Sequence, residues 1–178
     1  KVTFPGVWAN SCCSHPLSSD SESELIDASG VKRAAIRKLH QELGISPDDL
    51  SLDDFHFVTK MMYSARMNAD WIEREIDHIL LIQADVDIKI NQNEVSEIKW
   101  VSKQELEQIL VGDIDIGGEI APWFRCIAER VMTEEWWNSI GNLDRIVELR
   151  DDLIHDMGDV SDMSVSYTHL TLPTIQPV

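Results

Sequence analysis

The sequence lacks the features that would place the chain across a membrane, on a nucleic acid or among secreted proteins. No apolar run approaches the roughly 20 residues that a membrane-spanning helix needs. Only 15 Lys and Arg residues stand against 32 Asp and Glu residues, and a net charge of −17 repels nucleic-acid phosphates. The three cysteines, Cys12, Cys13 and Cys126, are odd in number and two are adjacent, unlike a secreted disulfide framework. We therefore expect a reducing, intracellular compartment, no membrane span and no nucleic-acid partner; an anionic substrate would need a local basic cluster or a metal ion.

Helical and strand-like patterns alternate along a chain whose 178 residues suit a single domain. Helical patterns cover residues 31–43, where Gly44 ends the helix, 102–110, where Ser102 and Glu105 form a capping box, 122 to beyond 137, and 143–154. Strand-like patterns cover residues 55–63, 73–83 and 94–101. Alternation in the first strand predicts one shared face for Phe55, Phe57, Thr59, Met61 and Tyr63. These elements predict an α+β domain over residues 1–157, with a mixed sheet flanked by helices, and a disordered or non-native tail over residues 158–178.

The segment 10–16, Asn-Ser-Cys-Cys-Ser-His-Pro, combines two thiols with an imidazole. Pro16 biases His15 toward extended geometry, in which alternate residues share a face. Cys13 and His15 then point together, and Cys12 points away. A thiol beside an imidazole is a candidate nucleophile or proton-transfer pair. The competing interpretation is two buried cysteines and a structurally satisfied histidine.

The segment 73–77, Glu-Arg-Glu-Ile-Asp, heads a strand that continues into a near-continuous apolar run. On a strand Glu73, Glu75 and Asp77 share one face, with neighbours roughly 6.5–7 Å apart. Three such carboxylates repel one another unless a cation or an arginine lies between them, and hard cations prefer oxygen ligands. The alternative is a solvated sheet face, which the apolar continuation at 79–82 disfavours.

The helical segment 33–45 resembles the helix of the Nudix box, which holds metal ions at a diphosphate. Arg37, Glu42, Gly44 and Ile45 fit that box, whereas Lys38 and Gln41 stand where it has glutamates. A pyrophosphohydrolase needs those glutamates to hold the metals that activate water. The pattern therefore indicates a diphosphate-binding scaffold without the hydrolytic ligands. An ordinary amphipathic helix is the alternative.

Four segments, 3–17, 41–45, 73–77 and 122–124, together resemble the type 1 isopentenyl-diphosphate isomerases, which have the Nudix fold. The resemblance covers roughly residues 1–140. It implies isomerisation of isopentenyl diphosphate to dimethylallyl diphosphate through a tertiary carbocation, a step of isoprenoid, sterol and lipid biosynthesis. It also implies a small homoallylic or allylic diphosphate as the bound partner, a monomer, and a cytoplasmic or peroxisomal location.

The same resemblance assigns roles to individual residues. Cys13 and Glu75 match the two proton-transfer groups, with Tyr63 near Glu75 and Trp123 over the hydrocarbon end. The metal ligands and substrate-binding residues that it implies are His15, Glu73 and Glu75 at an inner Mg²⁺, Mn²⁺ or Zn²⁺, Glu42 at a Mg²⁺ on the substrate diphosphate, and Lys1, Arg37 and Lys38 at the diphosphate. Family members carry a further stretch with two histidine ligands and an arginine, so we expect that this chain lacks its natural N-terminus and by itself turns over little substrate.

Two other functions remain open from the sequence. A Nudix-type nucleotide pyrophosphohydrolase is disfavoured by Lys38 and Gln41. A non-catalytic binding domain would retain the fold without turning over any allylic diphosphate.

Overall fold

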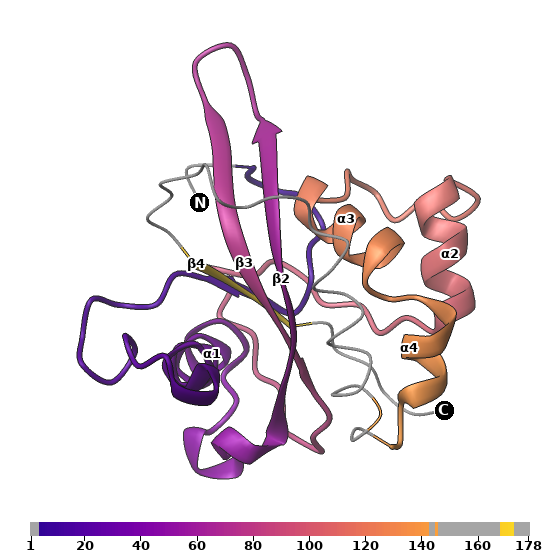
Figure 1. The fold of residues 1–178 in the computed structure, drawn as a ribbon. Helices are drawn as coiled ribbons and strands as arrows, with labels where there is room; N and C mark the ends of the chain where they lie inside the picture. The colour runs from indigo at the N-terminus through magenta and orange to yellow at the C-terminus, as the bar shows by residue number, and fades with distance from the viewer. Residues whose placement is uncertain (1–3, 143–144, 146–167, 173–178) are drawn as a thin grey trace.

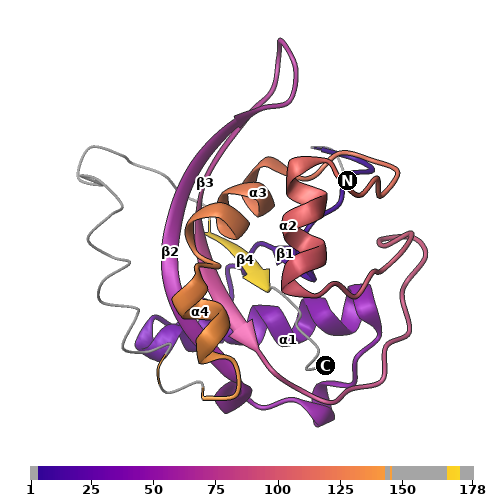
Figure 2. The same ribbon diagram turned by 90° about the vertical axis from the view of Figure 1, so that its right-hand side faces the viewer.

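A four-stranded sheet with helices on both faces forms the centre of the protein (Figure 1). The computed structural model describes residues 4–142, 145 and 168–172. The strands, in the order β1-β4-β3-β2 across the sheet, are Cys12–Ser14, Thr168–Leu172, Ile72–Ile82 and Phe55–Arg66. Helix α1 (Ser29–Leu43) covers one face; α2 (Lys103–Val111), α3 (Pro122–Arg130) and α4 (Glu134–Ser139) cover the other (Figure 2). Three short 3-10 helices span Ile26–Ala28, Pro47–Asp49 and Leu52–Asp54. The predicted α+β class, with a mixed sheet between helices, is confirmed.

Two apolar clusters, one on each face of the sheet, hold these layers together. The α1 cluster joins Leu39 and Leu43 to Phe55 and Leu80. The α3 cluster joins the other face of the hairpin to α2, α3 and α4; its members include Met61, Tyr63, Ile79, Leu106, Trp123, Ile127 and Trp136. Because β3 contributes to both clusters, Ile79, Leu80 and Leu81 of its apolar run are buried, as the sequence predicts for a central strand.

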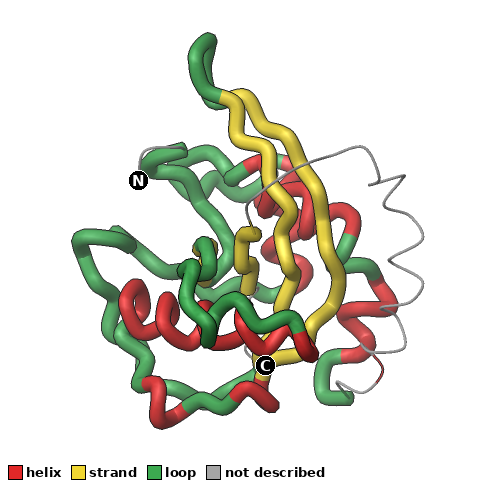
Figure 3. Tube along the Cα trace, turned by 60° about the vertical axis from the view of Figure 1, so that its left-hand side comes forward, coloured by secondary structure: helices red, strands yellow, loops and turns green. Residues whose placement is uncertain are grey.

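The β2–β3 hairpin is antiparallel and extends beyond the helices (Figure 3). A register shift between Phe57 and Thr59 marks an irregularity of the β-bulge type around Val58. The predicted single face from Phe55 to Tyr63 is therefore wrong. The extra residue reverses the alternation, so Phe55 and Phe57 pack in the α1 cluster, while Met61 and Tyr63 pack in the α3 cluster.

The predicted helix ends are confirmed for two helices. Helix α1 ends at Gly44, whose φ of 66° is the left-handed conformation. A β-carbon there would come within 2.3 Å of the Lys89 carbonyl oxygen, so the close approach also requires glycine. Helix α2 starts with the predicted capping box of Ser102 and Glu105.

The long helix predicted from residue 122 to beyond 137 is wrong, because it breaks at residues 131–133. Helix α3 ends at Arg130, and Thr133 starts α4 by accepting a hydrogen bond from the Trp136 backbone N–H. The break lets Val131, Met132 and Trp136 all turn into the α3 cluster. In a continuous helix Val131 would stay on the face of Ile127, but Met132 and Trp136 would turn to the opposite side.

Two further predictions about chain segments need correction. Residues 94–101 form no strand; Ile98 and Trp100 are exposed, so their alternation with polar residues finds no face to bury. Thr168–Leu172 form β4, parallel to β3 and antiparallel to β1, so the expectation of a tail without regular structure is wrong for these five residues. The domain boundary at residue 157 stays a prediction, and the predicted helix at 143–154 lies, apart from residue 145, outside the described residues. No helix in the described ranges is long and apolar enough to cross a membrane.

Candidate active site

Strand β1 places the two adjacent cysteines on opposite faces of the sheet. Cys13 pairs with position 171, which pairs with Ile79, so Cys13 lies on the face of Ile79 and, two and four residues back, of Asp77 and Glu75. Cys13 accordingly packs against the α3 cluster, and Cys12 belongs to the α1 cluster. The predicted separation of the two thiols is confirmed.

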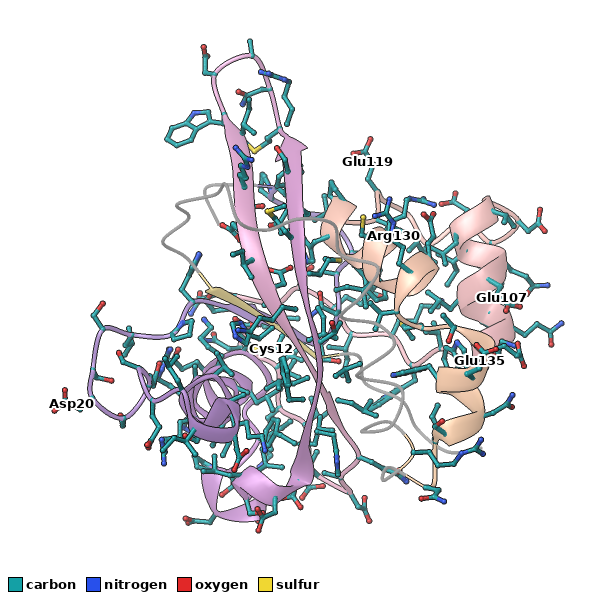
Figure 4. The ribbon with its side chains drawn as sticks, viewed as in Figure 1. Cys12, Asp20, Glu107, Glu119, Arg130 and Glu135 are labelled. Carbon is teal, nitrogen blue, oxygen red and sulfur yellow. The ribbon has the colours of Figure 1, made fainter. Side chains whose placement is uncertain are left out.

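Cys12 is a poor candidate for chemistry. Its side chain is 1% exposed and lies in the interior of the molecule (Figure 4). Burial raises the pKa of the Cys12 thiol well above its usual range, and the nearby Glu42 carboxylate adds to the rise. Cys12 therefore stays a neutral thiol and fills the core.

The carboxylates of β3 meet a tyrosine from β2 on the α3 side of the sheet. The Tyr63 hydroxyl lies 2.9 Å from Glu73 Oε2 and 3.2 Å from Glu75 Oε2, so it is within donating distance of both. Burial, followed by the neighbouring carboxylates Asp77, Glu75 and Glu73, raises the pKa of Tyr63 far above its usual value. The phenol thus keeps its single proton, which it can donate to either carboxylate, and one of the two, Glu75, is only 7% exposed.

The remaining carboxylates contribute differently. The labelled acidic side chains Asp20, Glu107, Glu119 and Glu135 point outward at the periphery (Figure 4). Most of the net charge of −17 is therefore solvated, and Glu22, Glu75 and Asp77 stand out as buried carboxylates.

His15 reaches the carboxylate pair from the loop after β1. Its Nε2 lies 3.5 Å from Glu75 Oε1, while its side chain is 51% exposed. A cation at the usual ~2.1 Å from each of these two atoms would see them at roughly 110–115°, close to the tetrahedral angle. His15 and Glu75 therefore fit two positions of one metal ion. Across the described residues, however, no three His, Cys, Asp or Glu side chains converge on one point, so the predicted set of His15, Glu73 and Glu75 is not closed.

Helix α1 contributes an ion pair that lies near Cys12. Lys38 Nζ lies 2.9 Å from Glu42 Oε1, and both side chains are largely buried. The pair brings together a predicted phosphate-binding cation and a predicted Mg²⁺ ligand. Lys1, the other predicted phosphate contact, lies outside the described residues.

Arg37, predicted to bind the diphosphate, has a different set of partners. Its Nε and Nη2 donate to the two carboxylate oxygens of Glu22 at 2.7 and 2.9 Å, and Nη2 also donates to the His15 carbonyl at 3.1 Å. The Arg37 hydrogen bond lowers the pKa of Glu22, and Glu22 also accepts from the Leu17 N–H at 2.8 Å. These hydrogen bonds hold the loop that carries His15 against α1 and so give Arg37 a structural role. A role of Arg37 in binding the diphosphate stays a prediction. Sequence reasoning missed Glu22, because it lies in a Ser- and Glu-rich stretch that reads as solvated loop.

Trp123 lies at the centre of the α3 cluster and is 0% exposed. Its ring stands edge-on to Phe4 at 5.5 Å and tilted to Tyr63 at 6.1 Å between centroids. Its indole Nε1 donates to Asn10 Oδ1 at 3.2 Å. Asn10 was not among the predicted site residues, since only the fold brings it next to α3. The buried Trp123 indole thus contacts the ring of Tyr63, whose hydroxyl lies beside Glu75.

A separate hollow of about 1050 Å³ also has His15 in its wall. Its walls come from residues 15–32 and 52–60 and from His78, and they include neither Glu75 nor Trp123. This hollow is therefore lined by other residues than the Glu75 and Trp123 side of the sheet.

Comparison with known proteins identifies the family of the chain. The NUDIX domain model matches residues 24–124. The chain is 45% identical to "Isopentenyl-diphosphate Delta-isomerase" of Dictyostelium discoideum, with 83% of this chain and 63% of that protein covered. It is 42% identical to "Isopentenyl-diphosphate Delta-isomerase II, chloroplastic" of Arabidopsis thaliana (84% and 54% covered) and 38% identical to "Isopentenyl-diphosphate Delta-isomerase 1" of Mesocricetus auratus (83% and 65% covered). The chain thus spans 54–65% of the length of these curated relatives.

Proposed function

The chain belongs to the Nudix family, and on that premise we propose that it is the catalytic part of an isopentenyl-diphosphate isomerase, converting isopentenyl diphosphate to dimethylallyl diphosphate. The observation that carries the proposal is the shared sheet face of Cys13 and Glu75, which ends at the buried Trp123 indole. Two groups able to transfer protons there flank an apolar, aromatic environment.

The reaction needs one proton added and one proton removed, with no net change in atoms. A proton adds to the terminal alkene carbon and leaves a positive charge on the tertiary carbon. Loss of a proton from the neighbouring methylene then forms the new double bond. We assign the two transfers to Cys13 and Glu75, which come from β1 and β3 and can therefore stand on two sides of a bound carbon chain.

The surroundings of these two groups suit a cationic intermediate. Tyr63 donates to Glu75 and so fixes the carboxylate at the substrate. The Trp123 π face stabilises positive charge without acting as a nucleophile. Burial of Trp123 and Glu75 excludes water, which would otherwise capture the cation as an alcohol.

We propose divalent metal ions as cofactors. His15 and Glu75 would hold an inner ion, with Glu73 close by. Glu42, together with Lys38, would serve the Mg²⁺-bound diphosphate from the α1 side, across the edge strand β1. Bound cations supply positive charge that a diphosphate needs in a protein of net charge −17. We also propose that the protein is a monomer in a reducing compartment, cytoplasmic or peroxisomal. The three free cysteines support the reducing compartment.

A nucleotide pyrophosphohydrolase is the second candidate, because it shares the Nudix fold. It requires glutamates on α1 where Lys38 and Gln41 stand. Lys38 moreover ion-pairs with Glu42, the glutamate that remains. This helix can face a diphosphate but offers fewer ligands for a hydrolytic metal cluster.

Deuterium uptake distinguishes the two functions. The full-length protein, supplied with Mg²⁺ and Zn²⁺, is incubated with isopentenyl diphosphate, and in a parallel sample with nucleoside diphosphates, in D₂O and followed by NMR. We expect deuterated dimethylallyl diphosphate and no free phosphate. Phosphate release from nucleoside diphosphates without deuterium uptake would establish the hydrolase and refute the isomerase.

A further inference from the structure

Asn10 connects the strand that bears Cys13 to the indole of Trp123. Its side chain is 8% exposed and makes two hydrogen bonds. Nδ2 donates to the Cys12 carbonyl at 2.6 Å, and Oδ1 accepts from Trp123 Nε1 at 3.2 Å. One amide therefore contacts the backbone next to one proton-transfer residue and the ring of the aromatic residue.

A parallel bridge between Trp8 and Ile120 brings these distant segments together. The Trp8 N–H donates to the Glu119 carbonyl, and the Ala121 N–H donates to the Trp8 carbonyl, both at 2.8 Å. The bridge sets residue 10 beside the first turn of α3, where Trp123 follows Pro122. These backbone hydrogen bonds thus hold the segments that carry Asn10 and Trp123 next to each other.

The chemistry of the two partners selects an amide at residue 10. An indole N–H can only donate and a carbonyl oxygen can only accept, so the linking side chain must offer one acceptor and one donor. Asn offers both groups at one carbon. Asp would place a carboxylate oxygen against the Cys12 carbonyl, and Leu would leave both partners unsatisfied in a buried setting.

We propose that Asn10 is a positioning residue of the isomerase reaction. It fixes the plane of the Trp123 indole relative to Cys13, so that the ring face points at the substrate carbon on which positive charge develops. The inference rests on the proposed function. Ring contacts with Phe4 and Tyr63 are apolar and tolerate rotation of the indole, whereas a hydrogen bond to Nε1 does not. Cation–π attraction requires the ring face to point at the charge, so a rotated indole loses it.

Removal of the indole N–H alone tests this role. Trp123→benzothienylalanine keeps the size and π face of the ring and replaces N–H by sulfur. Asn10→Leu removes the partner instead. We expect each change to lower kcat about tenfold and to leave KM for isopentenyl diphosphate within about twofold, because the diphosphate is held elsewhere. The double variant should be no slower than either single one, since both remove the same hydrogen bond.

Trp136 supplies a matched control. It belongs to the same cluster, is 1% exposed, and its Nε1 has no hydrogen-bond partner among the described residues. Trp136→benzothienylalanine should leave kcat unchanged. Multiplicative losses in the Asn10 and Trp123 double variant, or an unchanged kcat in Trp123→benzothienylalanine, would overturn the proposal. The latter variant decides the matter if Asn10→Leu does not fold. A full-length wild-type protein without deuterium uptake would defeat both proposals, whereas an active full-length wild type with multiplicative losses defeats this one alone.

Discussion

The opposite faces of Cys12 and Cys13 predict opposite consequences for the same substitution. Each is changed to alanine in the protein, which removes one sulfur atom and creates no new polar group. Cys12→Ala should lower stability and keep activity, because its thiol lies in the α1 cluster. Cys13→Ala should keep most of the stability and lose activity, because its thiol lies on the Glu75 face.

The expected magnitudes follow from burial and chemistry. Cys12 is 1% exposed, and deleting one buried heavy atom costs about 1 kcal/mol, by analogy with Ile→Val changes. For a domain of this size that lowers Tm by about 2–4 °C. Cys13 is only partly buried, so its Tm should change less. Losing a proton-transfer group costs roughly 10²–10⁴-fold in rate, so Cys13→Ala should be at least about 100-fold slower.

Calorimetry and the NMR isomerisation assay measure the two effects on the same samples. Each alanine variant is compared with the wild-type protein and with the alanine variant of the other cysteine. Equal losses of activity in both variants would refute the face assignment. A larger fall in Tm for Cys13→Ala than for Cys12→Ala would refute the burial argument.

Three further predictions rest on single contacts. Trp123→Phe should keep substantial isomerase activity and Trp123→Leu should lose more than about tenfold relative to it, because only the former retains a π face worth about 2 kcal/mol; equal rates would reduce Trp123 to a packing residue. Arg37→Lys should destabilise the protein by about 2 kcal/mol in urea denaturation, because a point charge cannot replace the two-pronged contact with Glu22; a change below about 0.5 kcal/mol would contradict that. Burial, with the charge of Lys60, lowers the pKa of His78 from 6.5 to about 4. Between pH 4 and 6.5 the unfolded chain binds more protons than the folded protein. The free energy of unfolding should therefore decrease as the pH is lowered from 6.5 to 4, by at most about 1.4 kcal/mol per pH unit. His78→Phe should flatten that dependence in denaturation curves.

Local chemistry in the sequence determined much of the site. Strand alternation placed Glu73, Glu75 and Asp77 on one face and separated Cys12 from Cys13, because a two-residue period is a property of the extended backbone. Gly44 and the Ser102–Glu105 box marked helix ends for the same local reason. Residue types then indicated the chemistry: a thiol, an imidazole and carboxylates, with Lys38 and Gln41 replacing hydrolytic ligands.

Tertiary structure decided what depends on contacts between distant segments. The irregularity at Val58 reverses the face of β2, and the break at residues 131–133 turns Trp136 inward; both serve packing against other elements, which no local pattern encodes. The pairing of Thr168–Leu172 between β1 and β3 follows from the unpaired edges those strands would otherwise present. Glu22 and Asn10 acquired their partners, Arg37 and Trp123, in the same way: a side chain 15 or 113 residues away becomes a neighbour only when the backbone has folded.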